Sequence, residues 1–413
     1  MKILLVNKYF YLEGGAEQSF FQTAKLLGKK GHDIVFFSMK HPQNFPSEYE
    51  KYFVQNVDYE NHNGFGALKA AGKILYSFES KKNIEQLIID ERPSIAHLNN
   101  IYHQISPSIL HSFRKHNIPV VMTLRDYKLV CASYSMISDK GICEACKDEK
   151  YFQCLLKGCV KDSKMKSLLN TVEMYLHHKI LHIYDHVDAF ISPSVFLKNK
   201  LEEMGFKRKI IHLSNFVALE DFVPHYSWDE KTIVYFGRLS KEKGLNTLID
   251  AMKNIDNVSL KIIGEGPLKN ELEMRSSGGD LKNKIRFLGY KTGDDLKEEI
   301  RRSMFVVLPS ECYENNPRTI IEGFALGKPA VGSNLGGIPE LLKNETNGLL
   351  FEQGNPKDLR EKINHLVDNP ENIEKMGRNA RMFIDDCLSA ERHYERLIEI
   401  YDGAIQQKRR KES

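Results

Sequence analysis

Glu314 and Glu322 could bind a ligand that carries hydroxyl groups at two separate places. Seven residues lie between them, and on one helix this spacing would set the carboxylates about 80° apart and roughly 12 Å along the axis, too far to share a proton. Pro317 favours the first helical position, and Gly327 with Pro329 predicts the helix end. We therefore expect Glu314 on the loop that enters the helix and Glu322 inside the helix.

The backbone amides near Arg318 and Thr319 form the first turn of this predicted helix. Amides of a first helical turn lack internal partners and carry partial positive charge, so they can bind an anion. An anion site between two carboxylates that accept hydroxyl protons matches the order of groups in a nucleotide diphosphate sugar: polyol, pyrophosphate and ribose.

Three motifs in this half of the chain resemble the donor site of the retaining glycosyltransferases of family 4, which have the GT-B fold. They are Glu314-x7-Glu322, Gly237-Arg238-Leu239 followed by Lys243-Gly244, and Gly336-Gly337-Ile338-Pro339-Glu340. The resemblance implies that Glu314 binds hydroxyls of the transferred sugar and Glu322 the ribose. It also implies that Arg238 and Lys243 grip the diphosphate.

Further donor contacts are expected just after predicted strands, because ligands meet the carboxyl ends of parallel strands. Gly264 and Tyr290 follow such strands, and the matching family segments wrap the nucleotide base. We also expect the glycine-bearing loop at Gly14 and Gly15, after the first strand, to contact the donor. No GxGxxG motif opens a helix after the first predicted strand of either half of the chain. This absence disfavours an enzyme that binds the dinucleotide NAD.

The length of 413 residues predicts two domains, and an apolar fraction of 41% with a charged fraction of 28% is typical of a globular protein. Alternating strand and helix patterns, with strands expected at 95–98, 189–192, 232–236 and 259–263 among others, predict two doubly wound Rossmann-like domains. They are expected at 1–215, the acceptor-binding domain, and 216–388, the nucleotide-sugar-binding domain, with an interdomain cleft as the ligand site. The resemblance implies that a last helix, within 389–413, crosses back to the first domain. No apolar run approaches roughly 18 residues, so we expect a cytoplasmic protein.

Net charge is +4 over the whole chain. Residues 1–215 hold 29 basic and 22 acidic side chains, a balance of +7, and the remainder hold 30 and 33, a balance of −3. A basic first domain could face an acidic acceptor or the anionic inner face of the cell membrane, and the lysine-rich apolar stretch 164–184 could contact that membrane. The alternatives are ordinary charge scatter and an apolar stripe that packs in the core. We expect no nucleic-acid partner.

His97 and Asn99 are expected on the acceptor side of the first domain, and Arg125 is expected at the reacting centre. His97 ends a predicted strand, and either an acceptor-side role or a hydrogen-bonded structural role fits an isolated histidine. The family commonly has histidine at the reacting centre in T-L-H-D-Y, whereas this chain has Thr123-Leu124-Arg125-Asp126-Tyr127. An arginine stays protonated and cannot act as a base, but it can hold a sugar hydroxyl or a phosphate.

Five of the seven cysteines lie between 131 and 159, in an expected Cys-rich insert of the first domain at 131–160. Four of them follow the pattern Cys143-x2-Cys146-x7-Cys154-x4-Cys159. Two close pairs without a secretion signal favour metal thiolates over disulfides, so the pattern predicts a structural zinc site, with free thiols as the alternative. Cys312 adjoins the donor motif and is interpreted as a packed residue.

Together these features predict a retaining, metal-independent glycosyltransferase. It would move a sugar from a nucleotide diphosphate sugar, with UDP favoured, to a cell-envelope, exopolysaccharide or lipid-linked glycan acceptor. No Asp-x-Asp metal-diphosphate element is present, so Arg238, Lys243 and the helix amides would neutralise the leaving group. Two alternatives remain: a nucleotide-sugar epimerase of the same fold, and a noncatalytic nucleotide-sugar-binding subunit.

Overall fold

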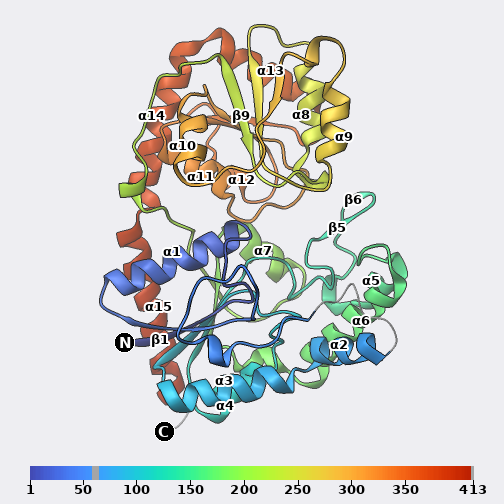
Figure 1. Cartoon of the computed structure of the whole chain (residues 1–413), viewed down its shortest axis with the longest axis vertical. Helices are drawn as coiled ribbons and strands as arrows, with labels where there is room; N and C mark the ends of the chain where they lie inside the picture. Colours follow the sequence, from blue (N-terminus) through green and yellow to red (C-terminus); the bar gives the residue numbers. More distant parts are fainter. Residues whose placement is uncertain (58–64, 411–413) are drawn as a thin grey trace. The chain divides into compact units, whose positions relative to one another are not determined.

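The computed structural model describes residues 1–57 and 65–410. Two compact units make up the chain. Unit 1 holds residues 1–138, 143–214 and 393–413, and unit 2 holds residues 139–142 and 215–392. The last three residues of the expected 389–413 segment lie outside the described residues. Each unit is considered by itself (Figure 1).

Strands and helices alternate along most of the chain. The strands are β1 (Lys2–Val6), β2 (Asp33–Phe37), β3 (Ile95–Leu98), β4 (Val120–Thr123), β5 (Ile137–Ser138), β6 (Gly141–Ile142), β7 (Ala189–Ser192), β8 (Ile210–His212), β9 (Thr232–Phe236), β10 (Ser259–Ile263), β11 (Ile285–Phe287), β12 (Val306–Leu308), β13 (Ala330–Ser333) and β14 (Gly348–Phe351). The helices are α1 (Gly15–Lys29), α2 (Phe65–Leu75), α3 (Phe78–Glu91), α4 (Ile109–Lys115), α5 (Phe152–Lys157), α6 (Lys164–Tyr175), α7 (Val195–Glu203), α8 (Leu245–Met252), α9 (Lys269–Ser276), α10 (Gly293–Arg301), α11 (Arg318–Ala325), α12 (Ile338–Leu341), α13 (Pro356–Asp368), α14 (Pro370–Cys387) and α15 (Ala390–Arg410).

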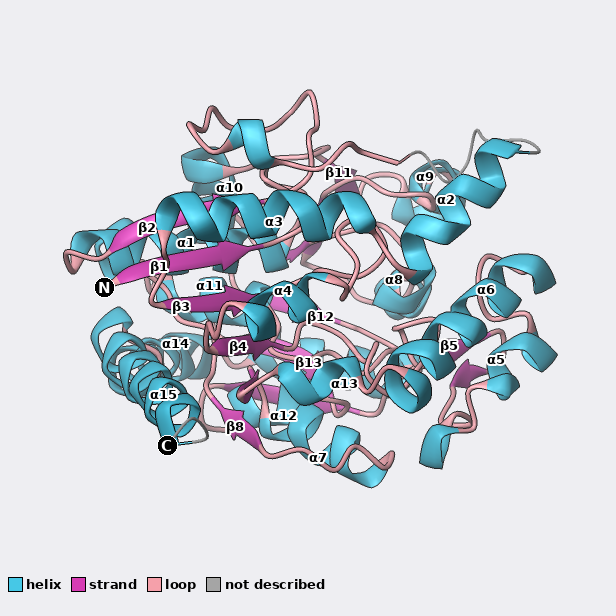
Figure 2. Ribbon diagram, turned by 90° about the horizontal axis from the view of Figure 1, so that it is seen from below, coloured by secondary structure: helices cyan, strands magenta, loops and turns pink. Residues whose placement is uncertain are grey.

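Unit 1 is built on a six-stranded sheet in the order β2-β1-β3-β4-β7-β8, and all the strand pairs are parallel. Consecutive residues of β1 from Ile3 to Val6 are all buried, which means that both faces of the sheet are covered. Helices flank the strands, as a parallel sheet requires (Figure 2). The small pair β5-β6 lies outside this sheet.

The last helix, α15, belongs to unit 1 from residue 393 onward. Its buried residues Leu397, Ile400 and Tyr401 pack in one apolar cluster with β1 and α1 residues (Figure 1). The end of the chain therefore contributes to the core of the first unit, as expected of a crossover helix.

Unit 2 repeats the plan with a six-stranded parallel sheet in the order β11-β10-β9-β12-β13-β14. Its core is a single large apolar cluster that includes residues of α8, α11, α13 and α14. The order of the sheet reverses between β9 and β12, so the loops after these strands lie at a topological switch point, where doubly wound folds bind ligands.

The strand positions agree closely with the sequence patterns at Ile95–Leu98, Ala189–Ser192, Thr232–Phe236 and Ser259–Ile263. The expectation for Pro317 is wrong by one residue, because Pro317 caps α11 in an extended conformation and the helix begins at Arg318.

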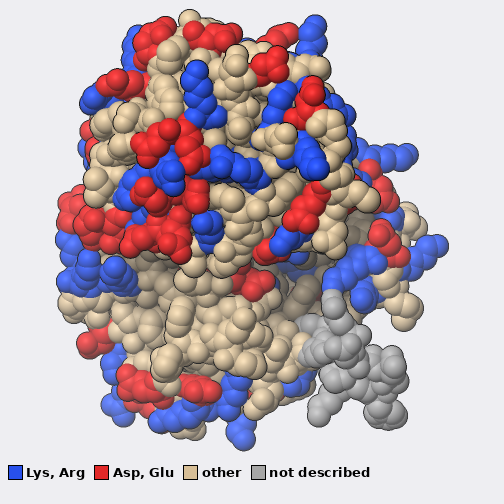
Figure 3. Space-filling model, turned by 45° about the horizontal axis from the view of Figure 1, so that its top comes forward, with Lys and Arg blue, Asp and Glu red and all other residues tan. Residues whose placement is uncertain are grey.

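Within residues 1–57 and 65–410, no helix combines the length and apolar character needed to cross a bilayer. On the face seen in Figure 3, basic and acidic side chains are interspersed.

Candidate active site

The loops after β9 and β12 in unit 2 touch through their backbones. Gly244 ends the loop that carries Lys243, and its φ is +66°. A Cβ placed on Gly244 would lie 1.9 Å from the carbonyl oxygen of Pro309, the residue after β12. Only glycine allows this approach, so the glycine holds Lys243 against the segment that leads to Glu314.

A second close approach fixes the loop that carries Glu314. The amide of Gly337 donates to the carbonyl oxygen of Glu314 at 2.7 Å, and a Cβ on Gly337 would lie 1.7 Å from the carbonyl oxygen of Asn315. The Gly336-Gly337 motif therefore has a mechanical role, because it lets the loop after β13 support the Glu314 loop.

Lys243 and Glu314 form an ion pair, with 2.6 Å between Nζ and Oε1. The hydroxyl of Ser310 donates to the same carboxylate oxygen at 2.6 Å. Burial would raise the pKa of Glu314, but the Lys243 charge and these hydrogen bonds outweigh it and hold the pKa below its ordinary value. Burial would lower the pKa of Lys243, and Glu314 more than reverses that effect. Both groups are therefore charged at neutral pH.

Glu322 lies inside α11, as expected, and the side chain of Arg318 contacts it. Arg318 donates from Nε and Nη2 to Glu322 Oε1 at 3.0 and 2.9 Å, and both residues are buried. Sequence reasoning treated Arg318 only as a backbone amide donor, so this contact adds a side-chain role: the guanidinium orients one carboxylate oxygen of Glu322.

Of the remaining predicted donor residues of unit 2, Arg238, Gly264 and Tyr290 lie on loops after strands, and Thr319 lies in the first turn of α11. Arg238 has an exposed side chain, and its carbonyl oxygen accepts from the Tyr235 hydroxyl at 2.8 Å. Gly264 donates from its amide to the carbonyl oxygen of Gly289 at 2.8 Å. The neighbouring Tyr290 is 65% exposed, and the hydroxyl of Thr319 donates to a backbone carbonyl at 3.2 Å.

In unit 1, Arg125 and Asn99 come together at the ends of β4 and β3. Arg125 Nε donates to Asn99 Oδ1 at 3.1 Å. The loop after Arg125 is anchored by Lys128, whose Nζ lies 2.7 Å from Glu173 on α6; both side chains are almost fully buried. This buried ion pair escaped sequence reasoning, because nothing in the local pattern links residues that are 45 positions apart.

The geometry of His97 favours the structural alternative. Its ring nitrogens lie 2.7 Å from the Tyr401 hydroxyl and 2.7 Å from the Thr123 hydroxyl. Burial, with Arg125 nearby, lowers the pKa of His97 to about 3, so the ring is neutral. His97 therefore links the sheet to α15, and neither ring nitrogen is left to contact a glycan acceptor.

Gly14 and Gly15 are exposed at the start of α1. Close to them, Glu17 is buried, and burial raises the pKa of its carboxyl group despite an amide contact from Asn7 at 3.4 Å. Because these glycines belong to unit 1 and the three donor motifs to unit 2, their part in donor binding stays a prediction.

The cysteines divide between the two units. Cys312 in unit 2 is buried, and burial raises the pKa of its thiol to about 12, consistent with a packed, unreactive residue. Five cysteines of the insert line one pocket in unit 1. Among the described residues, no three histidine, cysteine, aspartate or glutamate side chains are already arranged to hold a metal ion.

Ser310 is the main contact in unit 2 that sequence reasoning missed. It lies two residues after the end of β12, and its hydroxyl contacts Glu314. Its carbonyl oxygen in turn accepts from the Ser333 hydroxyl at 2.7 Å. The position just after a strand was the available signal, and the serine was overlooked beside the more conspicuous glutamates.

Two family profiles match the chain. The profile described as "Glycosyltransferase Family 4" matches residues 13–221, and the one described as "Glycosyl transferases group 1" matches residues 220–383. An uncharacterized glycosyltransferase of Methanocaldococcus jannaschii is 34% identical over 196 residues, which cover 48% of this chain and 54% of that protein. The chain thus spans about half the length of this relative.

Two further relatives are more distant in sequence. An uncharacterized 42.6 kDa protein in the cps region of Klebsiella pneumoniae is 28% identical and matches 98% of this chain and all of its own length. The lipopolysaccharide core biosynthesis glycosyltransferase LpsD of Rhizobium meliloti is 25% identical, over 54% of this chain and 66% of its own.

The fold agrees with that of solved structures. HepE of Anabaena, in complex with UDP and glucose, superposes with a TM-score of 0.70 at 17% identity, over 97% of this chain and 99% of HepE. These comparisons confirm the predicted GT-B fold and the transferase class. The chain belongs to the glycosyltransferases, the group of proteins that both profiles describe. The relatives do not favour the epimerase or noncatalytic alternatives.

The Lys243–Glu314 pair predicts a characteristic pH dependence. Because the pKa of Glu314 is depressed, its stabilising effect is present above its unfolded pKa and is lost as the pH falls through the folded value. Lys243→Met leaves the largely buried Glu314 carboxylate without its cation. The substitution is expected to lower the free energy of unfolding by about 3 kcal/mol near pH 7. Burial then raises the Glu314 pKa, so the cost becomes smaller in acid, where the carboxyl group is neutral.

Thermal unfolding of the parent and of Lys243→Met at pH 7 and pH 4 measures this effect. The difference in Tm between the two proteins is expected to be larger at pH 7. Lys241→Met, which removes an exposed lysine two residues away, is the matched control and is expected to show little difference at either pH. An equal loss of Tm at both pH values for Lys243→Met would contradict the ion pair.

Proposed function

We propose that the protein is a retaining glycosyltransferase that uses a nucleotide diphosphate sugar, with UDP as the favoured nucleotide, and transfers the sugar to a cell-envelope or lipid-linked glycan. The observation that carries the proposal is the Lys243–Glu314 pair, which puts a cation and a carboxylate at the switch point of the unit 2 sheet. The UDP bound in the HepE complex supports a UDP-sugar as the donor. The name of LpsD, which refers to lipopolysaccharide core biosynthesis, supports a cell-envelope glycan as the acceptor.

Each polar group of the donor has a proposed partner. Arg238 and Lys243 bind the diphosphate, together with the amides at the start of α11. Glu314 accepts hydroxyl protons of the sugar, and Glu322, oriented by Arg318, accepts those of the ribose. Gly264 and Tyr290 lie beside the base. When the diphosphate binds, Lys243 is shared with it, and Glu314 gains freedom to accept from the sugar.

The proposed reaction takes place on one face of the sugar. The acceptor hydroxyl oxygen bonds to the anomeric carbon on the face from which the diphosphate leaves, and the bond from that carbon to the phosphate oxygen breaks. The hydroxyl proton passes to the leaving phosphate oxygen, and the anomeric configuration is preserved. Arg238 and Lys243 stabilise the charge that develops on the diphosphate, which is the charge a divalent cation would otherwise neutralise.

Donor choice and stereochemistry can be measured together. UDP-, GDP-, ADP- and dTDP-sugars are screened by thermal shift, and the selected donor is incubated with envelope glycan acceptors in the presence of EDTA. NMR of the product is expected to show the donor's anomeric configuration. An inverted product would contradict the retaining mechanism, and a strict requirement for magnesium or manganese would contradict the cation-free clamp. Conversion of the sugar without any acceptor would indicate an epimerase.

Substitutions in the donor site separate binding from chemistry. Arg238→Ala is expected to lower kcat/KM, with a loss of about 2 to 4 kcal/mol in transition-state stabilisation. The reason is that the hydrogen bonds of the Arg238 side chain strengthen as the diphosphate leaves. Glu322→Ala is expected mainly to weaken UDP binding. Lys241→Ala is the control, because it removes an exposed cation three residues after Arg238. If Glu322→Ala binds UDP as tightly as the parent, the ribose assignment is wrong.

Arg125 is proposed to hold a hydroxyl of the sugar or acceptor, since it stands where the family commonly has histidine. Asn99 fixes the Nε side of its guanidinium. Arg125→Ala is expected to lower turnover roughly ten- to a thousandfold by removing a positioned donor. Arg125→His is expected to keep substantial activity and could gain an ionisation near 6.5 in its pH profile. Unchanged kinetics in Arg125→Ala would place the residue outside the reacting centre.

A membrane contact is proposed for α6 and its neighbour α5. In the stretch 164–184 some apolar residues pack inward, such as Met174, but Met165, Leu168 and Val172 are exposed on one face of α6 at i, i+3 and i+7. Leu156 on α5 is also exposed, at 67%. Exposed Lys164 and Lys166 interleave with this apolar stripe, so its chemistry fits an anionic lipid surface.

Co-sedimentation with phosphatidylglycerol-containing vesicles tests the contact. Binding is expected at low salt, with a marked loss at high salt and in the triple variant Met165→Ser, Leu168→Ser, Val172→Ser. Met274→Ser in unit 2, which removes an equally exposed methionine, is the control and is expected to bind normally. No binding of the parent at low salt would end the proposal.

A further inference from the structure

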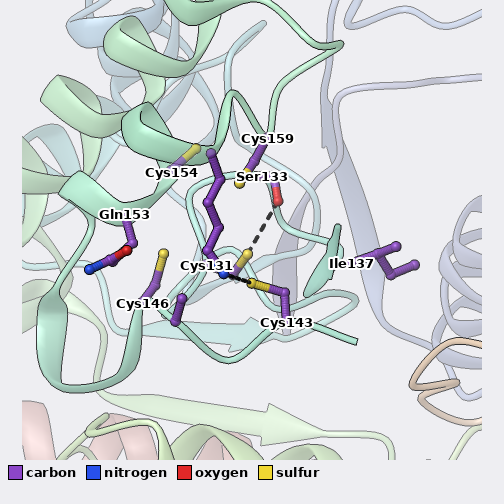
Figure 4. A pocket seen from close by; sticks show the side chains of 10 residues that line it. Cys131, Ser133, Ile137, Cys143, Cys146, Gln153, Cys154 and Cys159 are labelled. Atoms are coloured by element: carbon purple, nitrogen blue, oxygen red, sulfur yellow. Dashed lines mark hydrogen bonds between the residues drawn. The ribbon is translucent and has the colours of Figure 1, made fainter. Parts of the chain in front are cut away.

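Five cysteines from separate segments of unit 1 line one pocket. Cys131 follows β4, Cys143 and Cys146 follow β6, Cys154 lies on α5, and Cys159 lies just after α5. Figure 4 shows their side chains around the pocket, together with Ser133 and Gln153. Cys131, Cys146 and Cys154 are buried, and Cys143 and Cys159 are half-buried. The pocket therefore concentrates thiols where solvent has little access.

Hydrogen-bond donors point at several of the sulfur atoms. Lys157 Nζ donates to Cys143 Sγ at 3.3 Å. Cys131 Sγ lies 3.3 Å from the Ser133 hydroxyl oxygen. Donors of this kind favour the thiolate form, and thiolates are the form in which cysteines bind metal.

Thiolates that lie this close together repel one another unless a positive charge is near. Lys157, whose Nζ contacts Cys143, supplies one such charge. A divalent ion would supply two more.

We propose that Cys143, Cys146, Cys154 and Cys159 bind one zinc ion as a tetrahedral thiolate site. Zinc takes four thiolates in structural sites, and pairs of cysteines separated by a few residues are the usual way to supply them. The sulfur atoms line the wall of the pocket without forming a ready ligand set, so the ion draws them together by rotation of the side chains.

Cys131 is assigned as a neighbour of the ion and not as a ligand. Its sulfur already has the Ser133 hydroxyl as a partner. Cys131 also lies one residue before Ala132, whose carbonyl oxygen accepts from Lys128 Nζ at 3.1 Å. The zinc site thus stiffens the insert next to the lysine that anchors the Arg125 loop.

The metal content of the parent protein tests the proposal directly. The protein is produced in zinc-supplemented medium and purified without metal chelators. Elemental analysis is expected to give close to one zinc per chain. Titration with a mercurial reagent and a metallochromic indicator is expected to release it as the thiols react. Cobalt in place of zinc is expected to give the strong thiolate-to-metal absorption and the visible bands of a tetrahedral site. These measurements need no variant.

Variants then assign the ligands. Cys143→Ser and Cys159→Ser are expected to reduce bound zinc at least tenfold and to lower Tm, whereas Cys131→Ser and the exposed Cys387→Ser are expected to keep the metal. Less than a tenth of a zinc per chain in the parent, with all seven thiols freely titratable, would overturn the proposal. A Cys154–Cys159 disulfide in the purified parent, or full zinc retention in Cys143→Ser and Cys159→Ser, would overturn it as well.

Discussion

The ion pair between Lys243 and Glu314 is the interaction on which the unit 2 site depends. It joins the loop after β9 to the loop after β12, and it keeps both charges in place although the two side chains are largely buried. Neither residue could reach this geometry alone. Gly244 lets one loop approach Pro309, and Gly337 lets a third loop support the backbone at Glu314. The glycines of the motifs therefore build the frame that holds the charged residues in place.

Unit 1 uses a comparable arrangement with different groups. Arg125 is oriented by Asn99 from the neighbouring strand, and the loop that follows is tied to α6 by the buried pair of Lys128 and Glu173. His97 connects the sheet to α15 through Tyr401. The last helix thus contributes to unit 1 through a buried polar contact as well as through apolar packing.

Much of the fold follows from local patterns in the sequence. Long apolar strands such as Thr232–Phe236 were predictable because burial on both faces leaves an unbroken apolar run. Two edge strands, β8 and β14, were not predicted, because a run of three or four residues cannot be told by periodicity alone from other short apolar segments. In the site, the positions of Glu314 and Glu322 followed from helix signals, but their partners Lys243 and Arg318 depend on tertiary or side-chain geometry. The Lys128–Glu173 pair carries no local signal at all.

Lys243 is proposed to pair with Glu314 in the free protein and with the diphosphate in the complex. Calorimetric titration of the selected nucleoside diphosphate into the parent and into Glu314→Gln measures this exchange directly. If Glu314 competes for Lys243, the neutral glutamine releases the lysine, and the free nucleotide is expected to bind Glu314→Gln several-fold more tightly while sugar transfer is lost. Tenfold weaker binding of the free nucleotide to Glu314→Gln would contradict the account.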